Sequence, residues 1–189
     1  MPFSQVRNVL FAPYVRYGIR YYYRTSNKEK RYIARKLVGF ARQDIYEVIS
    51  DVKHYETFLP FCTKSTILKY QPKELHANLE IGFPPIVENY TSHVILDKPY
   101  YLEAKCFDGK LFDYLETKWI FNPGLQSNSK TCIIDFSIKF RFKSVFYSHV
   151  ASIFFDKLVQ QMENAFLNET ARRYGQPSVP LYILSPTKS

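Results

Sequence analysis

The sequence predicts an α+β fold of the helix-grip type, in which a curved antiparallel sheet of about seven strands is closed by a long C-terminal helix. Three observations support this prediction. Six runs of strand-like composition follow one another between residues 63 and 143, separated by short turns rich in Pro, Gly and Asn. One further strand and two short helical segments precede these runs. A single long helix follows them.

The elements are expected in the following order along the chain. A first strand covers residues 31–40, a helix with apolar residues at helical spacing covers 43–52, and a short turn follows at 54–59. The six later strands are expected at residues 63–70, 74–83, 86–96, 100–107, 112–121 and 131–143. Short turns between successive strands favour an antiparallel meander, because parallel strands need long crossover connections.

The last of these strands, 131–143, has the clearest pattern, since apolar and polar residues alternate along it. The apolar positions are Cys132, Ile134, Phe136, Ile138, Phe140 and Phe142. A period of two places successive side chains on opposite faces of a sheet, so one face is expected to be buried and the other wetted. The buried face carries three Phe residues and must therefore cover a large apolar surface.

The final helix is expected at residues 144–174, where Arg172 and Arg173 occupy the last turn and Gly175 follows. Cations in the last turn and a glycine beyond it are typical of a helix end. The apolar band of this helix is broader than a surface helix requires. A curved sheet under such a helix encloses either a solid core or a cavity, and periodicity alone leaves both interpretations open.

The basic charge is concentrated in residues 1–36, which carry nine Lys or Arg against one acid, whereas the remainder carries 17 basic and 16 acidic residues. The stretch 1–26 has no acid and can form a cationic amphipathic helix of the kind that mitochondrial import recognises, although a basic tail is the alternative. We therefore expect a mitochondrial transit peptide and linker at 1–27, one domain at 28–176 and a C-terminal tail at 177–189. Because the body is nearly neutral, no nucleic-acid partner is expected.

The sequence shows neither a metal-binding motif nor a membrane-spanning segment. The four histidines lack HxH or HExxH spacing, and the three cysteines, Cys62, Cys106 and Cys132, lack CxxC spacing. Free cysteines in apolar strands usually behave as small buried hydrophobic residues, so these are expected in the core. No window reaches the roughly 18 uncharged apolar residues that would predict a transmembrane helix.

A catalytic constellation is also missing from the sequence. Glu88, Glu103 and Glu116 lie in expected strands and are candidate acids or bases, but pairing with cations on a solvated face is the favoured interpretation. The 16 Phe, 16 Tyr and single Trp exceed what a small core usually needs. Tyrosine combines an apolar ring with a hydroxyl group, which suits a mostly apolar pocket with a few polar anchors; ordinary core packing is the alternative.

Several motifs occur along the chain in a fixed order: Asp51-Val52 with Tyr55 and Phe58-Leu59-Pro60-Phe61-Cys62; Leu79-Glu80-Ile81-Gly82-Phe83-Pro84-Pro85 with Glu88, Tyr90, Thr91 and Ser92; Asp108-Gly109 and Phe112 with Leu115-Glu116-Thr117 and Trp119; Asp135-Phe136-Ser137; and Phe154-Phe155-Asp156. Together they resemble the coenzyme Q-binding START-domain family over about residues 30–175. The family usually has Trp where this chain has Phe61, so an aromatic ring is kept but an indole N–H is lost.

The resemblance implies a START-like fold and a mitochondrial protein that binds coenzyme Q in a hydrophobic cavity, with no catalytic cofactor. It implies a carrier or chaperone, not an enzyme, that supports electron transport and quinone biosynthesis at the matrix side of the inner membrane. The residues expected to contact the quinone are Phe58, Pro60, Phe61, Phe83, Pro84, Pro85, Tyr90, Ser92, Phe112, Tyr114, Trp119, Phe136, Phe140, Phe154 and Leu158. The wider superfamily leaves two alternatives open, a ribosome-associated or translation factor and a cyclase-type enzyme.

Two further features of the expected site are hydrogen-bond donors for the quinone ring and a route for the quinone into the cavity. The ring carries only acceptor oxygens, so Tyr90, Ser92 and Tyr114 are expected to donate hydrogen bonds to them. The hairpin tip at residues 82–85 is stiff, apolar and uncharged, and is expected to touch the membrane and open the cavity. An ordinary proline-stiffened turn is the alternative.

Overall fold

The computed structural model describes residues 29–83, 86–106, 108–110 and 112–184, and within these ranges it leaves aside the side chains of Phe83, Ile86 and residues 145–157. The predicted transit peptide therefore lies outside the described residues. The elements are β1 (Glu29–Val38), α1 (Arg42–Ser50), the 3₁₀ helix η1 (Val52–Thr57), β2 (Cys62–Gln71), β3 (Glu74–Phe83), β4 (Ile86–Asp97), β5 (Tyr101–Cys106), β6 (Phe112–Pro123), β7 (Cys132–Phe142), α2 (Val145–Tyr174) and β8 (Tyr182–Leu184). The predicted strands and helices are confirmed, with ends that differ by two residues at most.

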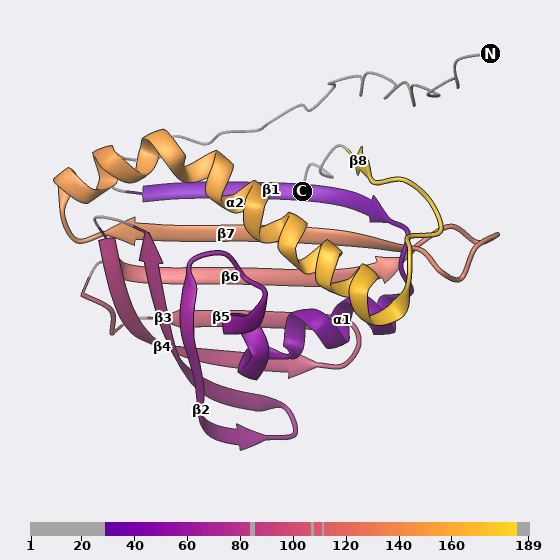
Figure 1. Cartoon of the computed structure of the whole chain (residues 1–189), viewed down its shortest axis with the longest axis horizontal. Coiled ribbons are helices and arrows are strands. Elements are labelled where there is room, and N and C mark those ends of the chain that lie inside the picture. The colour runs from indigo at the N-terminus through magenta and orange to yellow at the C-terminus, as the bar shows by residue number, and fades with distance from the viewer. Residues whose placement is uncertain (1–28, 84–85, 107, 111, 185–189) are drawn as a thin grey trace, which may run out of the picture.

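The described strands form a single sheet in the order β2-β3-β4-β5-β6-β7-β1-β8. Every neighbouring pair is antiparallel, and β1 closes the meander by pairing with β7 along its full length. Figure 1 shows that β2 and β3 turn away from the direction of β6 and β7, so the sheet is curved, and that α2 crosses it diagonally. The helix-grip prediction is therefore confirmed.

One strand was not expected from the sequence. Residues 182–184, within the predicted C-terminal tail, form β8 and pair with Arg35, Lys36 and Leu37 of β1. The sheet thus has eight strands among the described residues, one more than predicted. The segment between α2 and β8 crosses the end of β1, where the Ser178 N–H donates to the Gly39 carbonyl at 2.8 Å.

The alternation predicted for β7 is confirmed, since the six residues expected on its apolar face are all buried. Cys62, Cys106 and Cys132 are free and buried, as expected. Burial raises the pKa of Cys62 to about 11 and that of Cys132 to about 12, so both thiols stay protonated. These cysteines therefore behave as small apolar residues.

The predicted end of α2 is also confirmed. Gly175 has φ 93°, a left-handed conformation that glycine adopts without steric cost, and its N–H donates to the Ala171 carbonyl at 3.0 Å. Just before this end, Arg173 forms an ion pair with Asp51 at 2.6 Å and with the buried Glu169 at 2.7 Å. The C-terminal turns of α2 are thereby attached to the junction between α1 and η1.

The Glu169 carboxylate is expected to make stability depend on pH in the acid range. Hydrogen bonds from Arg172 and Arg173 lower its pKa from 4.5 to about 2 in the folded chain. This contribution is therefore fully present above about pH 4.5 and is lost as the pH falls through about 2. Glu169→Gln should reduce the free energy of unfolding at neutral pH, and the difference from wild type should vanish near pH 2 in urea titrations. A constant Glu169→Gln difference across this range would contradict the expectation.

Gly39 is expected to tolerate alanine poorly, because backbone atoms occupy the space that a Cβ would need. An added Cβ would lie 2.5 Å from the Val179 carbonyl oxygen and 2.6 Å from its nitrogen, and both are backbone atoms. Gly39→Ala should therefore lower the free energy of unfolding by about 1–3 kcal/mol in denaturant titrations. Gly82→Ala is the matched control, because its nearest neighbour would lie at an ordinary 3.5 Å. Equal stability of the two variants would show that the segment before β8 does not pack on Gly39.

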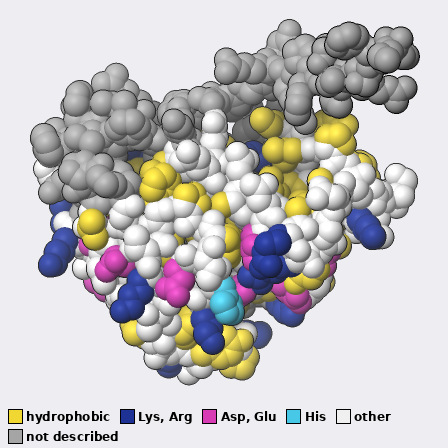
Figure 2. Space-filling model, in the orientation of Figure 1, with side chains coloured by type: hydrophobic (Ala, Val, Ile, Leu, Met, Phe, Trp, Pro, Cys, Tyr) yellow, Lys and Arg dark blue, Asp and Glu magenta, His cyan; other side chains and the backbone are white. Residues whose placement is uncertain are grey.

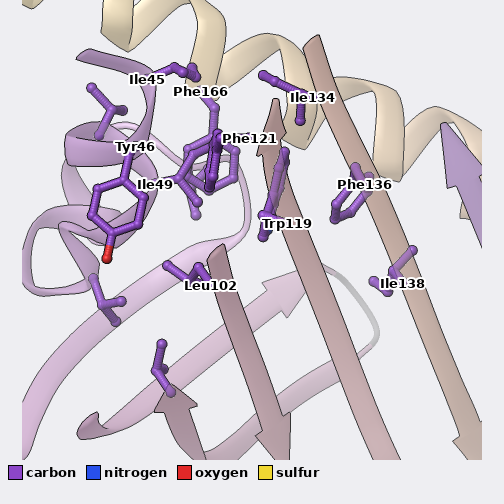
Figure 3. Close-up of a cluster of buried hydrophobic side chains, with 14 of the residues drawn as sticks. Ile45, Tyr46, Ile49, Leu102, Trp119, Phe121, Ile134, Phe136, Ile138 and Phe166 are labelled. Carbon is purple, nitrogen blue, oxygen red and sulfur yellow. The ribbon is translucent and has the colours of Figure 1, made fainter. Parts of the chain in front are cut away.

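The interior is closely packed where α1 meets the sheet. Tyr46 of α1 makes an edge-to-face contact with Phe121 of β6, with ring centroids 5.5 Å apart. Figure 3 shows these two side chains together with Ile45, Ile49 and Phe166. This packed end of the interior fixes α1 and the C-terminal half of α2 against the sheet.

The described surface agrees with the charge balance read from the sequence. On the face shown in Figure 2, Lys and Arg side chains lie beside Asp and Glu side chains. Within the described residues, the helices are too short or too polar for any of them to cross a membrane.

Candidate functional site

The space between the sheet and α2 is hollow. It forms a cavity of about 170 Å³ whose wall comes from η1, the segment before β2, strands β2 to β7, and α2. Most of the lining side chains are apolar, including Leu102, Trp119, Phe136, Ile138 and Phe166, which Figure 3 labels. A cavity of about 150 Å³ with such a lining holds one benzene ring. The question that periodicity left open is thus answered in favour of a cavity of ring size.

Nine residues predicted to contact the quinone line this cavity: Pro60, Phe61, Tyr90, Ser92, Phe112, Trp119, Phe136, Phe140 and Leu158. They come from separate elements that the curved sheet and α2 bring together. The rings of Trp119 and Phe136 are in contact, with centroids 4.1 Å apart and planes tilted by 30°. Phe61 reaches the cavity from a left-handed backbone conformation with φ 73°, which is uncommon for a bulky residue. The structure thus gathers these residues, and their contact with a quinone stays a prediction.

Two predicted residues lie elsewhere. Tyr114 points away from the cavity, and its hydroxyl donates to Glu29 at 2.6 Å. The pairing of β6 with β7 shifts by one residue between Phe112 and Tyr114, and this irregularity puts the two on different faces. Phe58 packs edge-to-face on Phe166 at 5.7 Å and is not part of the cavity wall. Placing Tyr114 in the quinone site was therefore wrong, and Phe58 supports the wall from outside.

Four predicted contact residues cannot be placed in this way. The side chains of Phe83 and Phe154, and both Pro84 and Pro85, lie outside the described residues. The membrane-touching hairpin therefore stays a prediction. The described part of its surroundings shows that the Gly82 N–H donates to the carbonyl of Phe61 at 2.8 Å, so the hairpin is attached to the cavity wall.

The cavity wall carries a few hydroxyl groups. Within the described residues, the side-chain hydroxyls of Tyr90 and Ser92 have no hydrogen-bond partner, although Ser92 is buried. Burial raises the pKa of Tyr90 well above its ordinary value, so its phenol stays protonated and can donate. Thr117 also lines the cavity and was not predicted. These groups suit a guest that needs a small number of hydrogen bonds.

A charged group in the wall was also missed. Glu163 of α2 lines the cavity and forms an ion pair at 2.8 Å with Lys36 of β1. The same carboxylate accepts a hydrogen bond from the Tyr32 hydroxyl at 3.1 Å. The sequence did contain a signal, because Glu163 interrupts the apolar band of the helix between Val159 and Phe166.

Two of the three strand glutamates, Glu103 and Glu88, have different environments. Glu103 pairs with Lys105 at 3.1 Å and Lys118 at 3.4 Å, which confirms the solvated-face interpretation for that residue. Glu88 contradicts it, because this side chain is buried and accepts hydrogen bonds from the Asn89 N–H and the Lys110 N–H. Its carboxylate accepts hydrogen bonds from two backbone N–H groups that would otherwise need water, and it thereby holds the segment after β5 in place.

The outer face of β3 and β4 brings together three potential metal ligands that were not expected from the sequence. His76 and His93 lie directly opposite each other, and Glu74 Oε1 is 2.9 Å from His76 Nε2 and 3.3 Å from His93 Nε2. All three ligand atoms lie within 4.8 Å of one another. The contact of His76 with Glu74 is a hydrogen bond, whereas His93 Nε2 has no hydrogen-bond partner within the described residues. His76 and His93 come together as a cross-strand pair, and the spacing of residues along the sequence does not reveal such a pair.

Comparison with known proteins gives the following similarities. Residues 38–167 match the model of the family described as polyketide cyclase / dehydrase and lipid transport. Coenzyme Q-binding protein COQ10, mitochondrial, of Drosophila melanogaster is 43% identical over 86% of this chain and 67% of its own length. COQ10 homolog B, mitochondrial, of Xenopus laevis is 43% identical over 82% of this chain and 64% of its own length, so the chain spans somewhat less than two thirds of that relative. The Zhui aromatase/cyclase of Streptomyces shares the fold with a TM-score of 0.67 at 14% identity, over 77% of this chain and 95% of its own.

Proposed function

This chain belongs to the polyketide cyclase / dehydrase and lipid transport family and, within it, to the coenzyme Q-binding COQ10 proteins, and we propose that it binds coenzyme Q in the cavity under α2. The observation that carries the proposal is an apolar, ring-sized cavity with isolated hydroxyl groups in its wall. The names of both relatives describe binding proteins, which favours a binding role over an enzymatic one.

The energetics favour recognition of the ring over recognition of the tail. Burial of each tail CH₂ is worth about 0.8 kcal/mol relative to water, but the bilayer core is equally apolar, so transfer of the tail from membrane to protein is nearly neutral. Selection therefore depends on how the ring fits and on its hydrogen bonds. Tyr90 and Ser92 supply hydroxyl donors from β4 for the ring oxygens. The cavity of about 170 Å³ is close to the size that holds one benzene ring, so the ring substituents and the tail of coenzyme Q must extend from it or widen it.

We further propose a carrier or chaperone that works peripherally at the matrix side of the mitochondrial inner membrane. It delivers coenzyme Q to respiratory complexes and to enzymes of quinone biosynthesis. Both relatives are named mitochondrial, which supports this location. The acid-free stretch 1–26 supports import of this chain through an N-terminal transit peptide.

The direct test is to purify the full chain, extract it with organic solvent and identify the released lipid by mass spectrometry. A polyprenyl quinone in near-stoichiometric amount is the expected result. Quinone-free protein that also fails to bind added coenzyme Q would overturn the proposal. Co-sedimentation of such protein with ribosomes would favour the translation-factor alternative, and turnover of an aromatic polyketide would favour the cyclase alternative.

A further inference from the structure

Glu163 is the charged residue among the described side chains of the cavity wall. Its side chain is only 6% exposed, and that of its partner Lys36 is 14% exposed. Taking two charges out of water is costly even when they are paired. A carboxylate in an otherwise apolar cavity therefore suggests a use in recognising the guest.

The geometry presents the carboxylate to the cavity and keeps its cation behind it. Glu163 lines both the main cavity and an adjoining space of about 20 Å³. Lys36 lines the smaller space and does not belong to the main wall. Tyr32, which donates to Glu163, lies opposite Ile138 in the sheet, and Ile138 lies opposite Thr117. Ile138 and Thr117 both line the cavity, so the pair formed by Glu163 and Lys36 lies beside the cavity wall.

The two carboxylate oxygens of Glu163 are used differently. Oε2 accepts both hydrogen bonds, from Lys36 Nζ at 2.8 Å and from the Tyr32 hydroxyl at 3.1 Å. Within the described residues, Oε1 accepts none. An ionised carboxylate has only acceptor sites, so a guest must bring the donor for Oε1.

We propose that Glu163 makes this cavity selective for the reduced form of its guest, a lipid hydroquinone with a free ring hydroxyl. This inference rests on the proposed function, that the cavity holds coenzyme Q. A ring hydroxyl of the quinol donates to Glu163 Oε1. The oxidised quinone has acceptor oxygens only, and these repel the lone pairs of the carboxylate.

The other polar groups of the wall do not discriminate between the two forms. The hydroxyls of Tyr90 and Ser92 can either donate or accept, so they bond equally to a quinone carbonyl or to a quinol hydroxyl. Glu163 is therefore the residue that distinguishes the quinol from the quinone. A hydrogen bond to a charged group corresponds to about a tenfold to hundredfold change in Kd.

The test is an anaerobic competition with full-length protein freed of lipid. Protein is mixed with equal amounts of a one-isoprene coenzyme Q analogue in its oxidised and its reduced form, separated by gel filtration, and analysed by chromatography with electrochemical detection. Wild type should retain the quinol with a preference of about tenfold or more. Glu163→Gln should lose this preference, because the amide offers both an N–H donor and a carbonyl acceptor.

Glu169→Gln is the matched control, since this buried, ion-paired glutamate is on the same helix but outside the cavity wall. It should keep the wild-type preference. If Glu163→Gln does not fold because Lys36 is left unpaired, the double variant Lys36→Met with Glu163→Gln replaces it. Equal retention of both forms by wild type, or an unchanged preference in a folded Glu163 variant, would overturn the inference and leave the proposed function intact. Failure of wild type to retain either form would instead overturn the proposed function.

Discussion

Ala104→Phe is expected to weaken coenzyme Q binding by at least about tenfold, or about 1.4 kcal/mol, while leaving the fold as stable as wild type or slightly more stable. Ala104 lines the cavity from β5 and lies opposite Thr117 and Val94 in the sheet. A phenyl ring there occupies a space that fits one guest ring. Because the ring fills an existing cavity, no packing is displaced and apolar contacts are gained. Binding is measured by titration with a short-tail coenzyme Q analogue and stability by denaturant unfolding.

The control is Lys105→Phe, which adds the same ring one residue along β5. Lys105 is outside the cavity wall and pairs with Glu103, a partly exposed ion pair whose loss costs little. This variant should bind the analogue like wild type. Wild-type binding by a folded Ala104→Phe protein would mean that the guest lies elsewhere, whereas loss of both binding and stability would mean that the space is too small for the ring.

The sequence was most informative where structure depends on neighbouring residues. The alternation along β7 predicted which six residues are buried, because the two faces of a strand follow from a period of two. The end of α2 followed from Arg172, Arg173 and Gly175 for equally local reasons. Of the nine predicted cavity residues, seven lie in the motifs that carry the family resemblance, and Phe140 and Leu158 lie on the apolar faces expected for β7 and α2.

The errors arose where structure depends on distant residues. The three-residue strand β8 is too short for a periodic pattern, and its pairing is decided by the open edge of β1. Tyr114 is two residues after Phe112, so a regular strand would place both on the same face. A register shift in the pairing of β6 with β7 places Tyr114 on the other face. The Glu163 and Lys36 pair joins residues 127 positions apart, so only the assembled fold brings them together.

The presence of a cavity was the least predictable feature. A hollow and a solid interior require the same apolar pattern, because periodicity reports which side chains point inward and not whether they fill the volume. In this chain both occur. The end of the interior near α1 is packed by Tyr46 and Phe121, whereas the region lined by Ala104 and Thr117 is open. Stability and binding should therefore respond to different substitutions.

Phe121→Ala is expected to lower the free energy of unfolding by about 3–5 kcal/mol, the range for an aromatic residue removed from a core. Phe121 is 2% exposed and lies against Tyr46. Since domains are typically stable by only about 5–15 kcal/mol, this is a large share of the total. The melting temperature should fall by roughly 10 °C. Denaturant and thermal unfolding measure the effect.

The same variant should bind the short-tail coenzyme Q analogue with wild-type affinity as long as it is folded, because Phe121 is not part of the cavity wall. Ile120→Ala is the matched control on the opposite face of β6, where the side chain is 38% exposed, and it should change stability far less. A Phe121→Ala protein as stable as the Ile120→Ala protein would show that the region near α1 is loosely packed. A folded Phe121→Ala protein with lost binding would show that this region also shapes the site. In that case the interior would not divide into a packed half that provides stability and a hollow half that binds the guest.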